Sequence, residues 1–239
     1  MPDPRLAGPS RLASSLAAVA VLALVAGSAA CSPGDGASRS AAGRDAAAAE
    51  AGSAGGGSDA AQAQEAPACR FQAPEEELSG RASPPDSASV RLGDATAVLC
   101  YGAPSARGRE VVGGLVPYGR PWRMGANEPT TLHLPFAAEL GGVRLEPGSY
   151  SLYAIPGESE WTIVVNGDTE RWGIPIDDEV RAADVGSFTV RPETLAEPVE
   201  RLTMGMEPAG GDSARVTVRW ERTGFSFALR RAEGGGGGG

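Results

Sequence analysis

From residue 88 onward, short runs of alternating apolar and polar residues recur between turns rich in glycine and proline. Successive side chains of a β-strand point to opposite faces, so this period of two predicts half-buried strands. In one run, Val216, Val218 and Trp220 are expected on one face and the polar residues between them on the other. The runs are residues 89–92, 96–101, 130–136, 149–155, 161–166, 187–191, 199–206, 215–220 and 225–230.

About nine short strands at this spacing predict an all-β fold, either an antiparallel β-sandwich or a partly open barrel. A short helix at residues 177–183 is the one expected exception, and residues 139–142 are read as a turn. The first 66 residues are nearly all Ala, Gly, Ser and short apolar runs. We therefore expect one domain at residues 69–231, followed by a disordered glycine tail at residues 232–239.

Residues 1–30 have the pattern of a secretory signal peptide. A basic start precedes an apolar run at residues 16–26, which is too short to span a bilayer comfortably. Small residues before Cys31 resemble the lipobox of bacterial lipoproteins, although Ser28 stands where leucine is usual. We expect export to the cell envelope with a lipid anchor on Cys31 as the membrane contact. The alternative is ordinary cleavage and a soluble periplasmic or secreted protein.

Residues 31–68 are rich in alanine, glycine and serine. They lack the apolar groups that could offset the entropy of ordering, so we expect a disordered tether. Export would place Cys69 and Cys100 in an oxidising compartment, where they could form a disulfide. A free buried thiol at Cys100 is the alternative.

The charge balance excludes several classes of partner and chemistry. Thirty acidic residues against 21 basic ones give a net charge of -9, which argues against a nucleic-acid partner. All 21 basic residues are arginines, so lysine-based covalent and phosphate-binding motifs are excluded. With three cysteines and one histidine, no zinc-like cluster can be assembled, and we expect no metal and no cofactor.

Residues 107–128 combine arginines and aromatic residues between glycines and prolines. Guanidinium groups suit bidentate contacts with carboxylates or phosphates, and aromatic rings could stack on a sugar. Because no complete catalytic set accompanies them, they favour binding of an envelope component or of a small anionic or saccharide ligand over catalysis. The candidate ligand-binding residues are Arg107, Arg109, Tyr118, Trp122, Arg123, Asn127 and Glu128.

Two alternatives stay open for these residues. Glu128 could be the acid or base of a carboxylate-based glycan hydrolase, which would require a second carboxylate nearby. The segment could instead be structural in an envelope protein, with its arginines paired to local acids, including an ion pair between Arg123 and Glu128. His133 could serve as a base for a serine, but the chain has no nucleophile-elbow motif.

The string LVPYGRPWRMGANEPTT at residues 115–131 and several shorter motifs resemble the bacterial family called domain of unknown function 2911. The resemblance covers about residues 81–230. It implies a secreted or lipid-anchored envelope domain of mainly β structure, and it brings no catalytic residues because the family has no established activity. The shorter motifs are YGAP at 101–104, RGR at 107–109, PGSYSL at 147–152, IPG at 155–157, WT at 161–162 and WG at 172–173.

Overall fold

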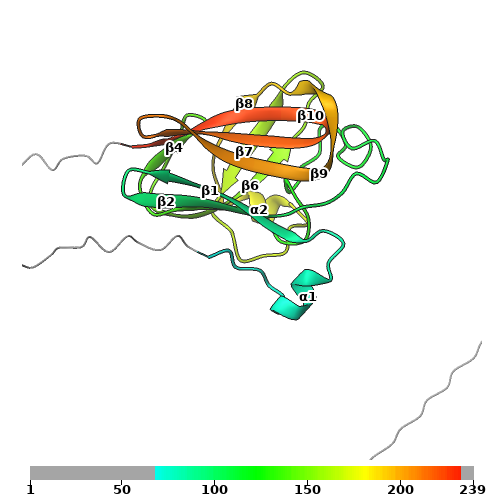
Figure 1. Ribbon diagram of the computed structural model, residues 1–239, viewed down its shortest axis with the longest axis horizontal. Helices are drawn as coiled ribbons and strands as arrows, with labels where there is room; N and C mark the ends of the chain where they lie inside the picture. Colours follow the sequence, from blue (N-terminus) through cyan, green and yellow to red (C-terminus); the bar gives the residue numbers. More distant parts are fainter. Residues whose placement is uncertain (1–67, 233–239) are drawn as a thin grey trace, which may run out of the picture. The chain divides into compact units, whose positions relative to one another are not determined.

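The computed structural model describes residues 68–232, which contain two antiparallel β-sheets packed face to face (Figure 1). One sheet has six strands in the order β1-β2-β3-β6-β7-β8, and the other has four in the order β5-β4-β10-β9. This confirms the predicted sandwich, and the sheets do not close into a barrel. The strands are β1 Pro85–Leu92, β2 Ala95–Gly102, β3 Thr130–Leu134, β4 Ala138–Leu140, β5 Val143–Leu145, β6 Gly148–Ile155, β7 Trp161–Asn166, β8 Asp184–Val190, β9 Glu193–Gly210 and β10 Ser213–Arg231.

The inner faces of the two sheets form one hydrophobic core. Leu99, Leu132 and Ile163 point inward from the six-stranded sheet, and Val216 and Leu229 point inward from the other. All five are almost completely buried. Burial of alternate residues on each strand therefore explains the period of two in the sequence, because removal of apolar surface from water drives the packing.

The C-terminal hairpin is longer than the sequence pattern predicted. The runs at residues 215–220 and 225–230 belong to one strand, β10, which pairs with β9 through register shifts around Glu221. Glu221 has a left-handed backbone with φ of 51°. A bulge lets a strand bend without ending, which explains why the alternation is interrupted while the strand continues.

The sequence pattern missed the hairpin of β4 and β5. Its strands have three residues each, too few to show a period. The turn between them is formed by Gly141 and Gly142, with φ of 57° and 96°. Positive φ at both central residues is the requirement of a tight hairpin turn, so the turn was recognised while the strands were not.

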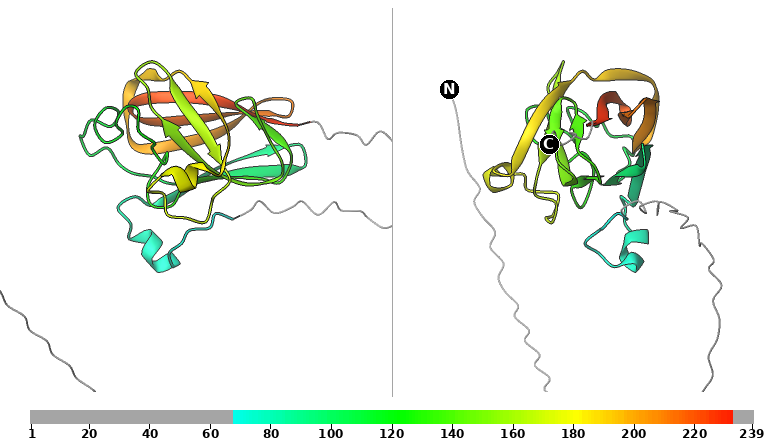
Figure 2. Two further views of the ribbon diagram at one scale, coloured as in Figure 1. Left: turned by 180° about the vertical axis from the view of Figure 1, so that it is seen from behind. Right: turned by 90° about the vertical axis from the view of Figure 1, so that its left-hand side faces the viewer.

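Two irregular segments cover the outer face of the six-stranded sheet (Figure 2). The first, residues 68–84, we call the strap; it contains α1 Glu75–Ser79. A disulfide between Cys69 and Cys100, with the Cα atoms 5.6 Å apart, joins the strap to β2 and confirms the pairing. The second is the 167–183 loop, which contains α2 Asp178–Arg181 at the position where a short helix was predicted.

The predicted signal peptide at residues 1–30, the lipidation site at Cys31, the tether up to residue 67 and the glycine tail from residue 233 lie outside the described residues. Both helices of residues 68–232 are too short to cross a membrane.

Candidate functional site

The 103–129 loop, between β2 and β3, lies at the right-hand end of the sandwich in Figure 1. Trp122 anchors it: its backbone N–H donates to the Ala154 oxygen at 2.7 Å, and its oxygen accepts from the Ala154 N–H at 2.8 Å. The Trp122 ring stacks on Trp220 with centroids 5.9 Å apart and meets Trp161 edge-on at 6.1 Å. One face of the Trp122 ring is therefore covered by protein.

The backbone next to Trp122 is held in an unusual conformation. Met124 and Asn127 are non-glycine residues with left-handed φ angles of 53° and 64°, each of which costs roughly 1 kcal/mol or more. The Met124 oxygen accepts from the Thr130 hydroxyl at 2.8 Å, and the Asn127 amide donates to the Ser83 oxygen at 3.1 Å. These contacts fix the backbone between Met124 and Asn127 and, with it, the position of the adjacent Arg123.

Arg123 is half-buried, and its Nε donates to the Gly125 oxygen at 3.2 Å. Burial lowers the pKa of Arg123 below its usual range. Among residues 68–232, no carboxylate oxygen lies within 4.0 Å of its guanidinium group. Arg123 thus holds a partly desolvated positive charge with no counter-ion from the described part of the chain.

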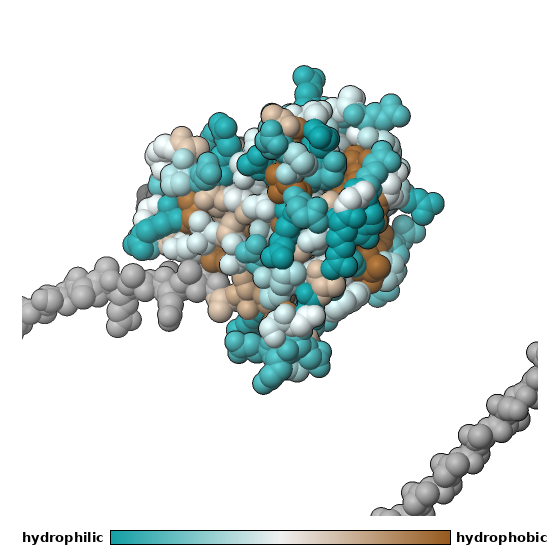
Figure 3. Space-filling view, turned by 45° about the vertical axis from the view of Figure 1, so that its right-hand side comes forward, coloured by the Kyte–Doolittle hydropathy of each residue, from teal (hydrophilic) through white to brown (hydrophobic). Residues whose placement is uncertain are grey.

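Arg123 lines a hollow of about 400 Å³ that we call the Arg123 groove. Arg109 lines it too, and its Nε and Nη2 donate to the Ala106 and Ser105 oxygens at 2.9 and 2.8 Å. The described lining contains no aspartate or glutamate. Figure 3, with this end turned forward, shows apolar surface between hydrophilic side chains. The apolar lining includes Leu115, Pro117, Pro121, Trp122, Ile174 and Trp220.

The other four predicted binding residues lie outside the groove lining. Arg107 is exposed, and its backbone N–H donates to Glu200 Oε1 at 2.8 Å. Tyr118 is 47% exposed. The side chains of Asn127 and Glu128 hydrogen-bond to the strap. The structure therefore brings Arg109, Trp122 and Arg123 together and separates the remaining candidates from them.

Glu128 is buried under the strap. Its Oε2 accepts from Arg81 Nη1 at 2.7 Å, and its Oε1 accepts from the Gln72 N–H at 3.0 Å. The Arg81 guanidinium also lies over the Trp172 ring, 5.8 Å from its centroid. The expected ion pair between Glu128 and Arg123 is wrong, because the strap brings Arg81 to Glu128 across 47 residues of sequence.

The surroundings of Glu128 keep it ionised. Burial by itself would raise the pKa of Glu128, but hydrogen bonds from Arg81, from its own backbone and from Gln72, with the charge of Arg81, lower it overall. A carboxylic acid that acts as a general acid needs the opposite shift. The Arg81–Glu128 pair therefore clamps the strap to the loop.

Sequence reasoning missed two walls of the groove, Ile174 and Trp220. Trp220 was assigned to the core, where most of its ring does lie, at 6% exposure. The Trp-Gly pair at residues 172–173 could have indicated that the 167–183 loop packs closely against another segment. A Cβ on Gly173 would meet the Asn127 oxygen and Arg123 Cδ, so the absence of a side chain lets the 167–183 loop support Arg123.

No group of three or more potential metal ligands occurs in the described range. A family model described as "Protein of unknown function (DUF2911)" matches residues 83–229. The Arg123 groove lies within this range, whereas nearly all of the strap precedes it. Comparisons with curated proteins and with solved structures gave no match.

Proposed function

The chain belongs to the DUF2911 family of proteins of unknown function, and we propose that it binds a small organic anion with an apolar body in the Arg123 groove. The observation that carries the proposal is the half-buried Arg123 guanidinium, which no described carboxylate neutralises. Moving a charge out of water is costly unless a partner compensates it. A ligand carboxylate would supply that compensation.

The rest of the lining indicates the chemistry of the ligand body. Leu115, Ile174 and the exposed edge of the tryptophan pair present apolar surface beside the two arginines. A volume of about 400 Å³ suits a small molecule, because ligand pockets span roughly 300–1,000 Å³. The bound anion would direct its carboxylate to Arg123 and Arg109 and its apolar part to Leu115 and Ile174.

The two alternatives from the sequence gain less support. Glu128 is ion-paired and covered by the strap, so a hydrolase built on it would first have to break the clamp. Sugar stacking on Trp122 is limited because Trp220 covers one ring face. A structural role fits Glu128 and Asn127, whose contacts hold the strap, but it leaves the charge of Arg123 unexplained.

We also propose that the protein is exported and anchored to the envelope membrane through Cys31. The Cys69–Cys100 disulfide supports export, because disulfides persist in oxidising compartments. Mass spectrometry of the mature N-terminus tests the anchor. A diacylated or triacylated Cys31 is expected, and an unmodified Cys31 would remove the lipoprotein proposal.

The binding proposal is tested by titrating the purified protein with octanoate and benzoate, using the tryptophan fluorescence of the groove as readout. The neutral counterparts octanamide and benzamide should bind much more weakly. Arg123→Met should reduce carboxylate affinity roughly 10- to 100-fold, since hydrogen bonds to charged groups contribute about 1.5–3 kcal/mol. Arg120→Met is the matched control, because Arg120 is exposed on the same loop and outside the groove lining. Equal affinities of both variants for the carboxylates would refute the proposal.

A further inference from the structure

A second hollow, of about 380 Å³, lies on the outer face of the six-stranded sheet, and we call it the polar trough. Its floor is formed by Thr131 and His133 of β3 and by Ser149 of β6. Thr131 and His133 alternate with the buried Leu132 and Leu134, so they point away from the core, and Ser149 lies on the same face as the cross-strand partner of His133. Its walls come from the strap, through Arg70, and from the 167–183 loop, through Thr169 and Glu170.

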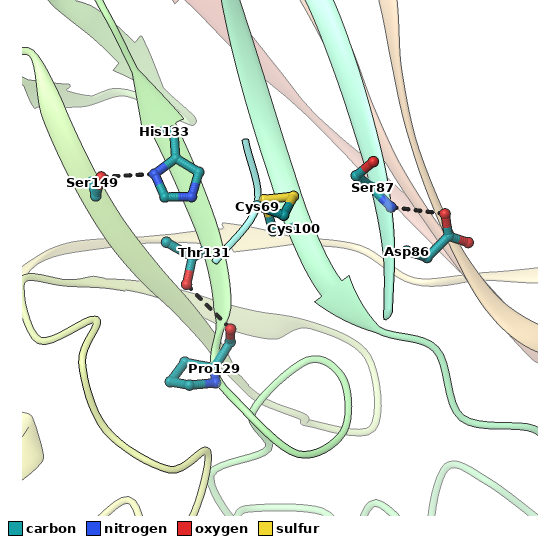
Figure 4. Close-up of a disulfide and its surroundings, with 8 residues drawn as sticks. All are labelled: Cys69, Asp86, Ser87, Cys100, Pro129, Thr131, His133 and Ser149. Atoms are coloured by element: carbon teal, nitrogen blue, oxygen red, sulfur yellow. Dashed lines mark hydrogen bonds between the residues drawn. A yellow bond between two sulfur atoms is a disulfide. The ribbon is translucent and has the colours of Figure 1, made fainter. Parts of the chain in front are cut away.

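Both walls are fastened to the sheet. The Cys69–Cys100 disulfide holds the strap wall one residue from Arg70 (Figure 4). The loop wall is held at Asp168, whose backbone N–H donates to Asn166 Oδ1 at 2.9 Å. Asn166 is itself completely buried. The trough is therefore preformed, and a ligand would not have to order its walls.

The floor carries an oriented pair of polar side chains. His133 and Ser149 are direct cross-strand neighbours, and His133 Nδ1 lies 2.7 Å from Ser149 Oγ (Figure 4). Burial, with the nearby charge of Arg70, lowers the pKa of His133, so the imidazole is neutral near pH 7 and offers one donor and one acceptor. No carboxylate of the described residues hydrogen-bonds the ring, so the third member of a Ser-His-acid triad is missing there.

The lining of the trough differs in kind from that of the groove. It has one guanidinium and one carboxylate, whose charges cancel, together with three hydroxyls and the imidazole. Such a lining both donates and accepts hydrogen bonds without favouring a net charge. Sugar hydroxyls likewise both donate and accept. The single positive and the single negative group leave the lining with no net charge to attract an anion.

We infer that the polar trough is a second binding site, for a neutral saccharide, with Arg70, Ser149 and Glu170 bonding its hydroxyls. The volume accommodates a short oligosaccharide segment. The site is independent of the Arg123 groove, because the two hollows share no lining residue.

The test is isothermal titration calorimetry of the purified protein with maltotriose, cellotriose, xylotriose and chitotriose. At least one is expected to bind. Ser149→Ala should weaken binding about fivefold and Arg70→Met about tenfold, as expected for a neutral and a charged hydrogen bond. Ser89→Ala is the matched control, because this exposed β1 hydroxyl lies outside the trough lining.

Thermal unfolding of each variant verifies that it folds. Binding of none of the four sugars, or an equal affinity of Ser149→Ala, Arg70→Met and Ser89→Ala, would overturn the inference. Arg123→Met should bind the sugar like the wild type, so failure of the groove proposal leaves this test unaffected.

Discussion

The Arg123 groove and the polar trough are hollows of similar size with opposite chemistry. The groove lies at an open end of the sandwich, and its lining is apolar, cationic and free of described acids. The trough lies on a sheet face, and its lining is polar with balanced charges. The difference shows that a sandwich can form one hollow in an irregular loop and another on a sheet face between two covering segments.

The two hollows are also held in shape by different structural features. The groove depends on local backbone conformation at Met124 and Asn127, which have positive φ. The trough depends on long-range fastening of the strap by Cys69 and Cys100. Changes that release the Cys69 end of the strap should therefore damage the trough first, because Arg81 and Ser83 still hold the other end of the strap to the groove loop. Changes at the loop should damage the groove first.

The largest expected effect comes from the double variant Cys69→Ser, Cys100→Ser. The disulfide spans 31 residues of sequence, and closing a loop of that length stabilises a protein by about 3–4 kcal/mol. Urea denaturation should show a loss of this size. Saccharide binding should weaken because the Arg70 wall is released, while octanoate binding should persist. An equal loss of saccharide and octanoate affinity would show that the shapes of the two hollows depend on each other.

A slightly smaller loss is expected from Glu128→Gln. The change leaves the half-buried Arg81 without its ionic partner, which costs about 3 kcal/mol. Urea denaturation at neutral pH measures it. The double variant Arg81→Met, Glu128→Gln should recover part of the loss, since it removes both charges, and an unchanged stability of Glu128→Gln would contradict the clamp.

The same pair predicts a pH dependence. The pKa of Glu128 is lowered in the folded protein, so the unfolded chain takes up the proton first as the pH falls. The stabilisation is complete above the ordinary glutamate pKa and is lost as the pH falls through the lowered folded-state value. The stability difference between wild type and Glu128→Gln should therefore shrink on acidification, and a constant difference would rule out ionisation as its cause.

The smallest effect on stability, about 1–3 kcal/mol by overpacking, is expected from Gly173→Ala. The added Cβ would meet the Asn127 oxygen and Arg123 Cδ. Carboxylate binding should weaken because Arg123 is displaced, and saccharide binding should not change. Gly167→Ala is the control, since its Cβ would make only ordinary contacts. Wild-type octanoate affinity in Gly173→Ala would show that Gly173 does not position Arg123.

Much of the fold could be predicted because alternation reports burial directly. Val218 and Trp220 point into the core, as their alternation with polar residues predicted. The paired glycines Gly141 and Gly142 likewise marked the turn of the β4–β5 hairpin. The three-residue strands beside them escaped, because so short a segment carries no period. The interruption of the apolar–polar alternation at Glu221 was interpreted as the end of a strand, because a bulge and a turn interrupt this alternation in the same way.

The candidate site was predicted as a region and not as a set of residues. Arg109, Trp122 and Arg123 converge, whereas Arg107 and Tyr118 lie outside the groove. Neighbours in an irregular loop can point in any direction, because no regular period governs them. Residue types in the sequence therefore indicated which chemistry was available, but not which side chains meet.

The sequence by itself determined the all-β class, the two cysteines that could pair in the domain and the absence of lysine. These follow from composition and from the local period of strands. Only the tertiary structure decided that Arg81 pairs with Glu128, that Arg123 keeps its charge unpaired in the described chain, and that His133 meets Ser149. Such contacts join residues distant in sequence, and they depend on how the strap, loop and sheet pack in space.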